Sequence, residues 1–427
     1  MSWQDEYKKK LVSLEEAATK LYSGDKVYMS GGMGAPVQLM EAVTARYKEL
    51  TNLEIVSGQL MNMFTMFTSP EYIGHINYHT IFMGPYERAG TRSGNVEINS
   101  VSLSKTVATI RDYYGVNTLI ADVSEPDENG DMFVGPLGVA GTVEVAEFAT
   151  KIIVQVNKYQ PKVKGYKDRI NVKDVHYICE YDHELPALPP PEITPVDQKI
   201  AELLLPYIKD GSCIQLGLGG LANAVGFGLT SKKNLSAHTE MFNDSMMELY
   251  EKGSLSGNIL AGHSFGTAKL YDFVEKHVKM APMSIVNNPV EIAKNDNMVS
   301  INCCLMSDLT GQICSESIGA KQYSAIGGQL DFVRGAAMSK GGQSFLCMPS
   351  TATVKGEVQS TIVSCLPQGQ IVTTPRDDVM YVVTEYGVAN LWCKPLEVRV
   401  NELIKIAHPD FREQLHAEAL AAGLICE

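Results

Sequence analysis

Short apolar runs alternate along the chain with segments whose apolar positions repeat at helical spacing. Three uncharged runs, at residues 118–121, 152–156 and 381–384, show the first pattern. Strands that are apolar on both faces are typical of parallel sheets covered by helices on both sides. The pattern therefore predicts an α/β fold in which helices cover mostly parallel sheets.

The first part of the chain contains a helix, a strand and a glycine turn in succession. A capping box at residues 13–16 predicts a helix that continues to about residue 22. Residues 26–29 then form an apolar strand, and the glycine-rich segment 30–36 leads into another helix.

The same order returns in the second half. Thr194 and Pro195 begin a helix with a favourable cap and a first-turn proline, and that helix is expected to end at residues 210–211. A strand at 213–216 and a glycine turn at 217–220 follow. This weak internal repeat predicts two related α/β domains.

A proline-rich segment at residues 185–191 separates the two copies. Such a segment is stiff and cannot join a sheet. We therefore expect an N-terminal domain at 1–184, a linker at 185–195 and a C-terminal domain at 196–427.

Charge and composition narrow the class of protein. The net charge of −13 argues against nucleic acid or an anionic membrane as the main partner. No uncharged apolar stretch reaches the length of about eighteen residues that a membrane span requires, and the beginning of the chain lacks the apolar core of a signal peptide. The nine cysteines include no C-x-x-C pair, which indicates reduced thiols in the cytoplasm and no metal site.

Glu240 is the main candidate for chemistry. It follows a predicted strand at 235–239, and ligands of such sheets gather at the carboxyl ends of strands. A carboxylate beside backbone amides, such as those of Gly327 and Gly328, suits acyl transfer. A glutamate with the ordinary pKa of about 4.3 is already ionised at neutral pH. From these residues alone, Glu240 could equally cap a helix, and Glu385 ends another strand in the same way.

Three further patterns leave alternatives open. The segment 217–222 also fits the dinucleotide fingerprint G-x-G-x-x-A, with Glu240 near the place of the ribose-binding acid. That interpretation predicts a nicotinamide-dependent oxidoreductase. His238 shares a strand face with Glu240, although a buried, hydrogen-bonded histidine is the simpler expectation. The methionine-rich segment 60–67 suits either a core or an acyl pocket.

Over nearly its whole length the sequence resembles the acetyl-CoA hydrolase/transferase family, and within it the butyryl-CoA:acetate and 4-hydroxybutyrate CoA-transferases. The blocks that carry the resemblance are 215–220, 238–241, 327–336, 381–387 and 406–412. The resemblance implies two CoA-transferase-type domains with the active site between them. It also implies that Glu240 is the catalytic nucleophile and Gly328 the oxyanion-hole glycine.

The resemblance further implies a set of residues that bind CoA or substrate. They are Gln215, Leu216, Gly217, Leu218, Gly219, Gly220, Asn287 and Gly327. No cofactor or metal is expected, because CoA and acyl-CoA are substrates. The expected partners are therefore acyl-CoA and a carboxylic acid, and the protein is expected to be a homo-oligomer.

The expected activity is transfer of CoA from a short-chain acyl-CoA to acetate, by a ping-pong route through a glutamyl-CoA thioester. Three other activities remain open: acyl-CoA hydrolysis, in which water replaces the acid; the nicotinamide-dependent oxidoreductase; and a sensor that binds acyl-CoA without turnover.

Overall fold

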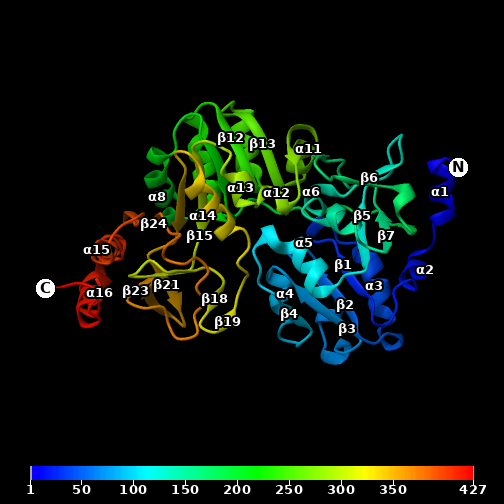
Figure 1. Cartoon of the computed structure of the whole chain (residues 1–427), viewed down its shortest axis with the longest axis horizontal. Helices are drawn as coiled ribbons and strands as arrows, with labels where there is room; N and C mark the ends of the chain where they lie inside the picture. The colour runs from blue at the N-terminus through cyan, green and yellow to red at the C-terminus, as the bar shows by residue number, and fades with distance from the viewer. Residues whose placement is uncertain (1, 427) are drawn as a thin grey trace. The chain divides into compact units, whose positions relative to one another are not determined.

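The computed structural model describes residues 2–426, and the chain divides into two compact units (Figure 1). The first unit contains the residues up to Leu188 together with Leu260–Val286. The second unit contains Pro189–Ile259 and the residues from Asn287 onward. The first unit is therefore discontinuous in sequence.

The sequence predicts that Leu260–Val286 belongs to the C-terminal domain, 196–427. In the structure this segment belongs to the first unit instead. Its packing gives the reason. The backbone N–H of Met283 donates to the carbonyl of Ala140 at 2.9 Å, within the first unit. Such a long-range partner leaves no local signal in the sequence.

A seven-stranded parallel sheet forms the centre of the first unit, in the order β10-β7-β5-β1-β2-β3-β4. Its strands are β1 Lys26–Met29, β2 Leu53–Ser57, β3 Ile76–Thr80, β4 Val96–Ile98, β5 Thr118–Val123, β7 Lys151–Val156 and β10 Tyr177–Glu180. Every residue of β5 is buried, which means that both faces of this strand are covered. The three strands expected here, at 26–29, 118–121 and 152–156, are confirmed to within two residues at each end.

The strands of the second unit follow the order β25-β24-β20-β15-β11-β12. They are parallel except for the pair of β24 with β25. Their bounds are β11 Cys213–Leu216, β12 Leu235–Phe242, β15 Met298–Cys303, β20 Gln343–Cys347, β24 Tyr381–Thr384 and β25 Gly387–Asn390. The predicted strands at 213–216 and 381–384 have the same bounds in the structure.

The principal helices of the second unit are α8 Pro195–Leu204, α9 Gly220–Gly228, α14 Gln329–Met338, α15 Leu396–Ile406 and α16 Pro409–Ala421. Helix α8 begins with the predicted cap and first-turn proline, and the Thr194 side chain accepts from the backbone N–H of Asp197 at 3.1 Å as part of a capping box. Within residues 2–426, none of the helices combines the length and the apolar character needed to cross a membrane.

The internal repeat appears in the structure as a shared topology. Strand β1 lies between β2 and β5, and β11 lies between β12 and β15, with parallel pairing throughout. A glycine turn and a helix follow each of these two strands, α3 Val37–Ala45 in the first unit and α9 in the second. The first helix of the repeat, α2 Leu14–Ala18, ends four residues earlier than the sequence predicts.

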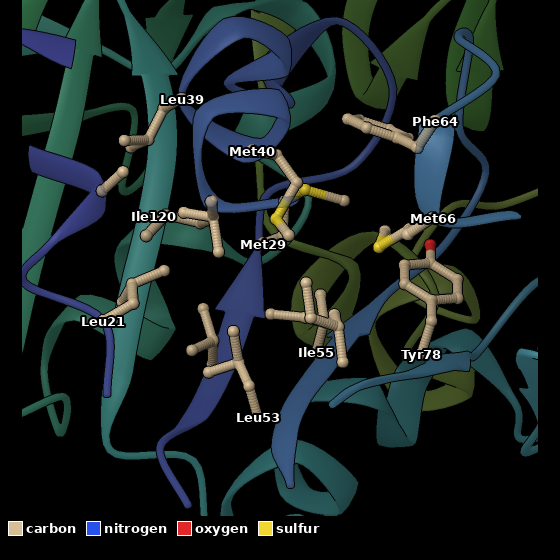
Figure 2. Packing of buried hydrophobic residues seen from close by; sticks show 14 of the residues in the cluster. Leu21, Met29, Leu39, Met40, Leu53, Ile55, Phe64, Met66, Tyr78 and Ile120 are labelled. Carbon is tan, nitrogen blue, oxygen red and sulfur yellow. The ribbon is translucent and has the colours of Figure 1, made fainter. Parts of the chain in front are cut away.

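The core of the first unit joins this sheet to helix α3. Met29, Ile55 and Ile120 come from the adjacent strands β1, β2 and β5, and they belong to one buried cluster with Leu39 and Met40 of α3 (Figure 2). The methionine-rich segment contributes Leu60, Phe64, Met66 and Phe67 to the same cluster. These four members of the segment are therefore core residues.

Candidate active site

Glu240 lies near the carboxyl end of strand β12, whose last residue is Phe242. The sequence predicts that the strand stops at residue 239, whereas its strand geometry continues for three more residues. Because β11 pairs with β12 in parallel, the glycine turn that follows β11 lies at the same edge of the sheet as Glu240. This edge is where ligands of parallel sheets bind.

Two groups of the second unit contact the Glu240 carboxylate. The side-chain amide of Asn287 is fully buried, and its Nδ2 donates to Glu240 Oε2 at 2.8 Å. Gly328 lies beside this hydrogen bond, because a Cβ atom added there would overlap both the same carboxylate oxygen and the Asn287 amide nitrogen. Only a glycine therefore allows the backbone to approach the carboxylate so closely.

The glycine pair sets the start of helix α14 against this carboxylate. Gly327 has φ +59°, in the left-handed region that favours glycine. Gly328 is the N-cap residue of α14. The first backbone N–H groups of a helix have no partners within the helix and carry its positive partial charge. The end of α14 that faces Glu240 therefore suits an oxyanion.

The environment changes the acidity of Glu240. The pKa of its carboxyl is raised to about 7: burial is the largest cause, the Asn287 hydrogen bond opposes the rise, and the negative charge of Asp331 adds to it. The expectation of an already ionised glutamate is therefore wrong, because near neutral pH a large fraction of Glu240 is protonated. Sequence reasoning gave Asp331 no role, although an acid in the first turn of a helix that begins at the site was a usable signal.

Gln215 and Leu216 end strand β11 and are both buried. The side-chain carbonyl of Gln215 accepts from Ser300 Oγ at 2.7 Å and from Asn302 Nδ2 at 3.2 Å. Its amide donates to Asn302 Oδ1 at 3.1 Å. This network fixes the end of β11, while the Leu216 side chain belongs to the hydrophobic core.

The four residues of the glycine turn, 217–220, differ in conformation and in the contacts that they make. Gly219 has φ +105° and caps α9, whereas the Leu218 side chain is 47% exposed at the tip of the turn. Gly217 donates its N–H to the carbonyl of Ile301 at 2.9 Å. A Cβ at Gly220 would lie 2.8 Å from the capping carboxylate of Asp197, so this glycine lets α9 pack against α8.

The structure gives Glu385 and His238 roles that differ from that of Glu240. Both oxygens of Glu385 accept hydrogen bonds from Ser350, one from its backbone N–H at 2.9 Å and one from its hydroxyl at 2.6 Å. Glu385 therefore stabilises a turn. His238 is buried and its Nδ1 lies 3.1 Å from Asn295 Nδ2, which confirms the expected hydrogen-bonded core histidine.

Comparison with known proteins identifies the family. The acetyl-CoA hydrolase/transferase N-terminal domain profile matches residues 1–189, and the C-terminal domain profile matches residues 266–419. The 4-hydroxybutyrate coenzyme A transferase of Clostridium kluyveri is 40% identical over 98% of this chain and 99% of that protein. The butyryl-CoA:acetate CoA-transferase of Anaerostipes caccae is 35% identical over 99% of both. The crystal structure of RipA from Yersinia pestis matches all of both chains with a TM-score of 0.93 and 32% identity.

The similarity to several CoA-transferases over nearly the full chain identifies an enzyme of the CoA-transferase class. The similarity extends over essentially the whole chain. The chain belongs to the acetyl-CoA hydrolase/transferase family. This membership favours acyl transfer over the dinucleotide interpretation of the glycine turn.

The acidity of Glu240 can be measured directly. In protein labelled with ¹³C at glutamate carboxyl groups, one resonance should titrate with a midpoint near pH 7 and disappear in Glu240→Gln. Asp331→Asn should lower that midpoint, because it removes a neighbouring negative charge, and Asn287→Ala should raise it, because it removes a hydrogen bond to the ionised form. A wild-type midpoint near 4.5 would contradict this description of the site.

The raised pKa also has a consequence for stability. Between the unfolded pKa of about 4.3 and the folded pKa of about 7, the native state binds the Glu240 proton more tightly than the unfolded state does. The contribution of Glu240 to stability therefore falls as the pH rises through this window. Glu240→Gln should raise the free energy of unfolding by on the order of 2 kcal/mol at pH 8 and by little at pH 4.

Denaturant unfolding of both proteins at the two pH values measures this difference. The exposed Glu357, in strand β22 Glu357–Ser360, provides the control substitution Glu357→Gln. An equal effect of Glu240→Gln at pH 4 and pH 8 would show that ionisation of Glu240 carries no cost in the folded state.

Proposed function

We propose that this enzyme transfers CoA from a short-chain acyl-CoA, butyryl- or 4-hydroxybutyryl-CoA, to acetate through a thioester on Glu240. The observation that carries the proposal is the Glu240 carboxylate, held by Asn287 and lying against the Gly328 backbone at the start of α14. The names of the relatives from C. kluyveri and A. caccae support the choice of substrates.

In the first half-reaction the ionised carboxylate attacks the thioester carbonyl. A bond forms between a Glu240 oxygen and the acyl carbon, and the bond from that carbon to sulfur breaks, so that an acyl-glutamyl anhydride and CoA thiolate result. The thiolate then attacks the glutamyl carbonyl. The free acid leaves, and a glutamyl-CoA thioester remains on the enzyme.

In the second half-reaction acetate attacks the glutamyl-CoA thioester. The same steps then run in reverse, and acetyl-CoA leaves while the Glu240 carboxylate is regenerated. Backbone N–H groups at the start of α14 can stabilise the oxyanion that forms in each addition step. The thioester free energy is conserved, because water takes no part in any step.

The surroundings of Glu240 suit a carboxylate that must act as a nucleophile and be held in a fixed direction. A raised pKa indicates a poorly solvated carboxylate, which is more nucleophilic than one that water stabilises. The Asn287 amide donates to one carboxylate oxygen and fixes its direction. We assign the exposed turn at Leu218 and Gly219 to binding of CoA, with Gln215, Leu216, Gly217 and Gly220 holding that turn in place.

Covalent catalysis at Glu240 can be tested by mass spectrometry. The enzyme is incubated with butyryl-CoA and then treated with borohydride, which reduces a glutamyl thioester to an alcohol. We expect a loss of about 14 mass units that peptide mapping assigns to Glu240. The same treatment of Glu240→Ala should leave the mass unchanged.

Parallel assays of thioester loss with and without acetate separate transfer from hydrolysis. Transfer predicts loss that depends on acetate and an equal yield of acetyl-CoA. Loss at the same rate without acetate would identify an acyl-CoA hydrolase. An unchanged mass together with turnover would place the nucleophile elsewhere.

The close approach at Gly328 predicts a severe effect of any side chain. Gly328→Ala should lower kcat/KM by at least about 10²-fold, because its Cβ displaces the Glu240 carboxylate and the donors around it. Gly253→Ala is a control for backbone strain without a clash, because Gly253 has φ +78°, where alanine is strained, but no neighbouring atom lies within 4 Å of an added Cβ. It should retain turnover. Normal turnover by folded Gly328→Ala would exclude the proposed role of this glycine.

A further inference from the structure

The chain leaves the first unit along a short segment, residues 181–188, which we call the strap. It follows strand β10 and ends where the second unit begins. Near its end, the Tyr271 hydroxyl donates to the carbonyl of Pro186 at 2.8 Å. The N–H of Leu188 donates to the carbonyl of Gly266 at 2.9 Å. The strap therefore lies against the segment that returns to this unit from later in the sequence.

His183 holds the beginning of the strap. Its Nε2 lies 3.0 Å from Oδ2 of Asp122 in strand β5, and its Nδ1 lies 3.2 Å from the carbonyl oxygen of Glu184. Its backbone N–H donates to Asn157 Oδ1 at 3.2 Å. Each ring nitrogen therefore faces an acceptor oxygen. A neutral imidazole has one donor and one acceptor, so this geometry fits the doubly protonated, charged ring.

Asp122 is the buried counter-ion of this ring. Its side chain is fully buried, whereas 18% of the His183 side chain is exposed. Gln155 Nε2 donates to its Oδ2 at 2.7 Å, and Gln160 Nε2 donates to its Oδ1 at 2.9 Å. Such N–H donors fit an ionised carboxylate. Burial raises the pKa of Asp122, and the hydrogen bond from His183 opposes that rise. The buried charge therefore depends on the proton of His183 for its compensation.

The other titratable groups beside the ring leave its proton in place. Asp182 forms an ion pair with Lys158 at 2.6 Å, and the Tyr181 ring lies 6.4 Å from that of His183. Burial and the charge of Asp122 raise the pKa of the Cys179 thiol to about 12, so this thiol is neutral. Burial lowers the pKa of His183 itself. The hydrogen bond and charge of Asp122, the Glu184 carbonyl and the charge of Asp182 outweigh burial, so the pKa is raised.

We propose that His183 and Asp122 form a pH-sensitive clasp, which holds the strap on the first unit while the ring is doubly protonated and releases it when the pH rises. Loss of one ring proton to solvent leaves a nitrogen lone pair facing either the Asp122 carboxylate or the Glu184 carbonyl. That contact becomes repulsive, and Asp122 is left as a buried charge without a counter-ion. Release adds the residues of the strap to the flexible connection between the units.

The direction of the pH dependence follows from the acidity of His183. A histidine in the unfolded chain has a pKa of about 6.5, and the pKa of His183 in the folded protein is higher. The stability that its second proton contributes is therefore fully present below about pH 6.5 and is lost as the pH rises through the folded pKa.

Hydrogen exchange of the full chain measures release of the strap. The prolines at 186 and 189–191 have no N–H, so a peptic peptide spanning 181–191 reports mainly on a few amides, among them those of His183 and Leu188. After correction for the intrinsic exchange rate, we expect opening of the strap to increase by about 10-fold between about pH 6 and about pH 9.

Two variants separate titration of His183 from the hydrogen bond that it makes. The amide of His183→Gln can still donate to Asp122 but does not titrate, so exchange of the strap should no longer depend on pH. The control His277→Gln changes an exposed histidine of α11, Ala268–His277, the helix that also carries Tyr271. It should retain the wild-type pH dependence.

A second measurement observes the ring protons themselves. In full-length protein with ¹⁵N-labelled histidine, the two ring nitrogens of His183 are assigned by their absence in His183→Gln. Both should be predominantly protonated at about pH 6.5, and they should titrate with the same midpoint as opening of the strap. If His183→Gln does not fold, His183→Asn provides the assignment and the variant that does not titrate.

The outcomes decide the inference without any assay of turnover. Exchange of the strap that is independent of pH in the wild type, or that changes equally in the variant without a titrating ring, would overturn the clasp. A His183 ring that is neutral at about pH 6.5 would overturn it as well. Failure of the clasp would leave the proposed CoA-transferase function intact, and failure of that function would leave the clasp intact.

Discussion

The contact of the Glu240 carboxylate with the Asn287 amide and the Gly328 backbone is the constraint on which the second unit depends. It requires the end of strand β12, the start of helix α14 and the residue after helix α12, Met283–Val286, to meet at one point. The same crowding that excludes a side chain at Gly328 also limits water around the carboxylate. Close packing and altered acidity are therefore two results of one arrangement.

Local sequence was sufficient for much of the fold. The strands at 213–216 and 381–384 have their predicted bounds, because apolar runs bounded by turn residues leave little freedom in where a strand begins and ends. The end of helix α2 and the end of strand β12 were not predictable to the residue, because tertiary contacts decide where an element frays or continues. Assignment of Leu260–Val286 to the first unit required knowledge of a partner distant in sequence, such as the Ala140 carbonyl that accepts from Met283.

The sequence and its resemblance to a family identified Glu240 as the main residue of the site, but they did not predict its raised pKa. The spacing of residues could not rank Glu240 above Glu385, and only the resemblance to a family did so. The structure supplies the physical distinction, since Ser350 satisfies both oxygens of Glu385. The pKa of Glu240 and the pairing of His183 with Asp122 arise from burial and contacts between segments far apart in the sequence. No local pattern could therefore have revealed them.

The discontinuity of the first unit has a consequence for how the protein is made. Synthesis proceeds from the N-terminus, and domains generally fold as units as they leave the ribosome. Here the first unit lacks Leu260–Val286 until the strand and turn that carry Glu240 have already been synthesised. The first unit therefore cannot fold completely on its own in advance, and an N-terminal fragment that ends at the proline-rich linker would expose the surface that this segment normally covers.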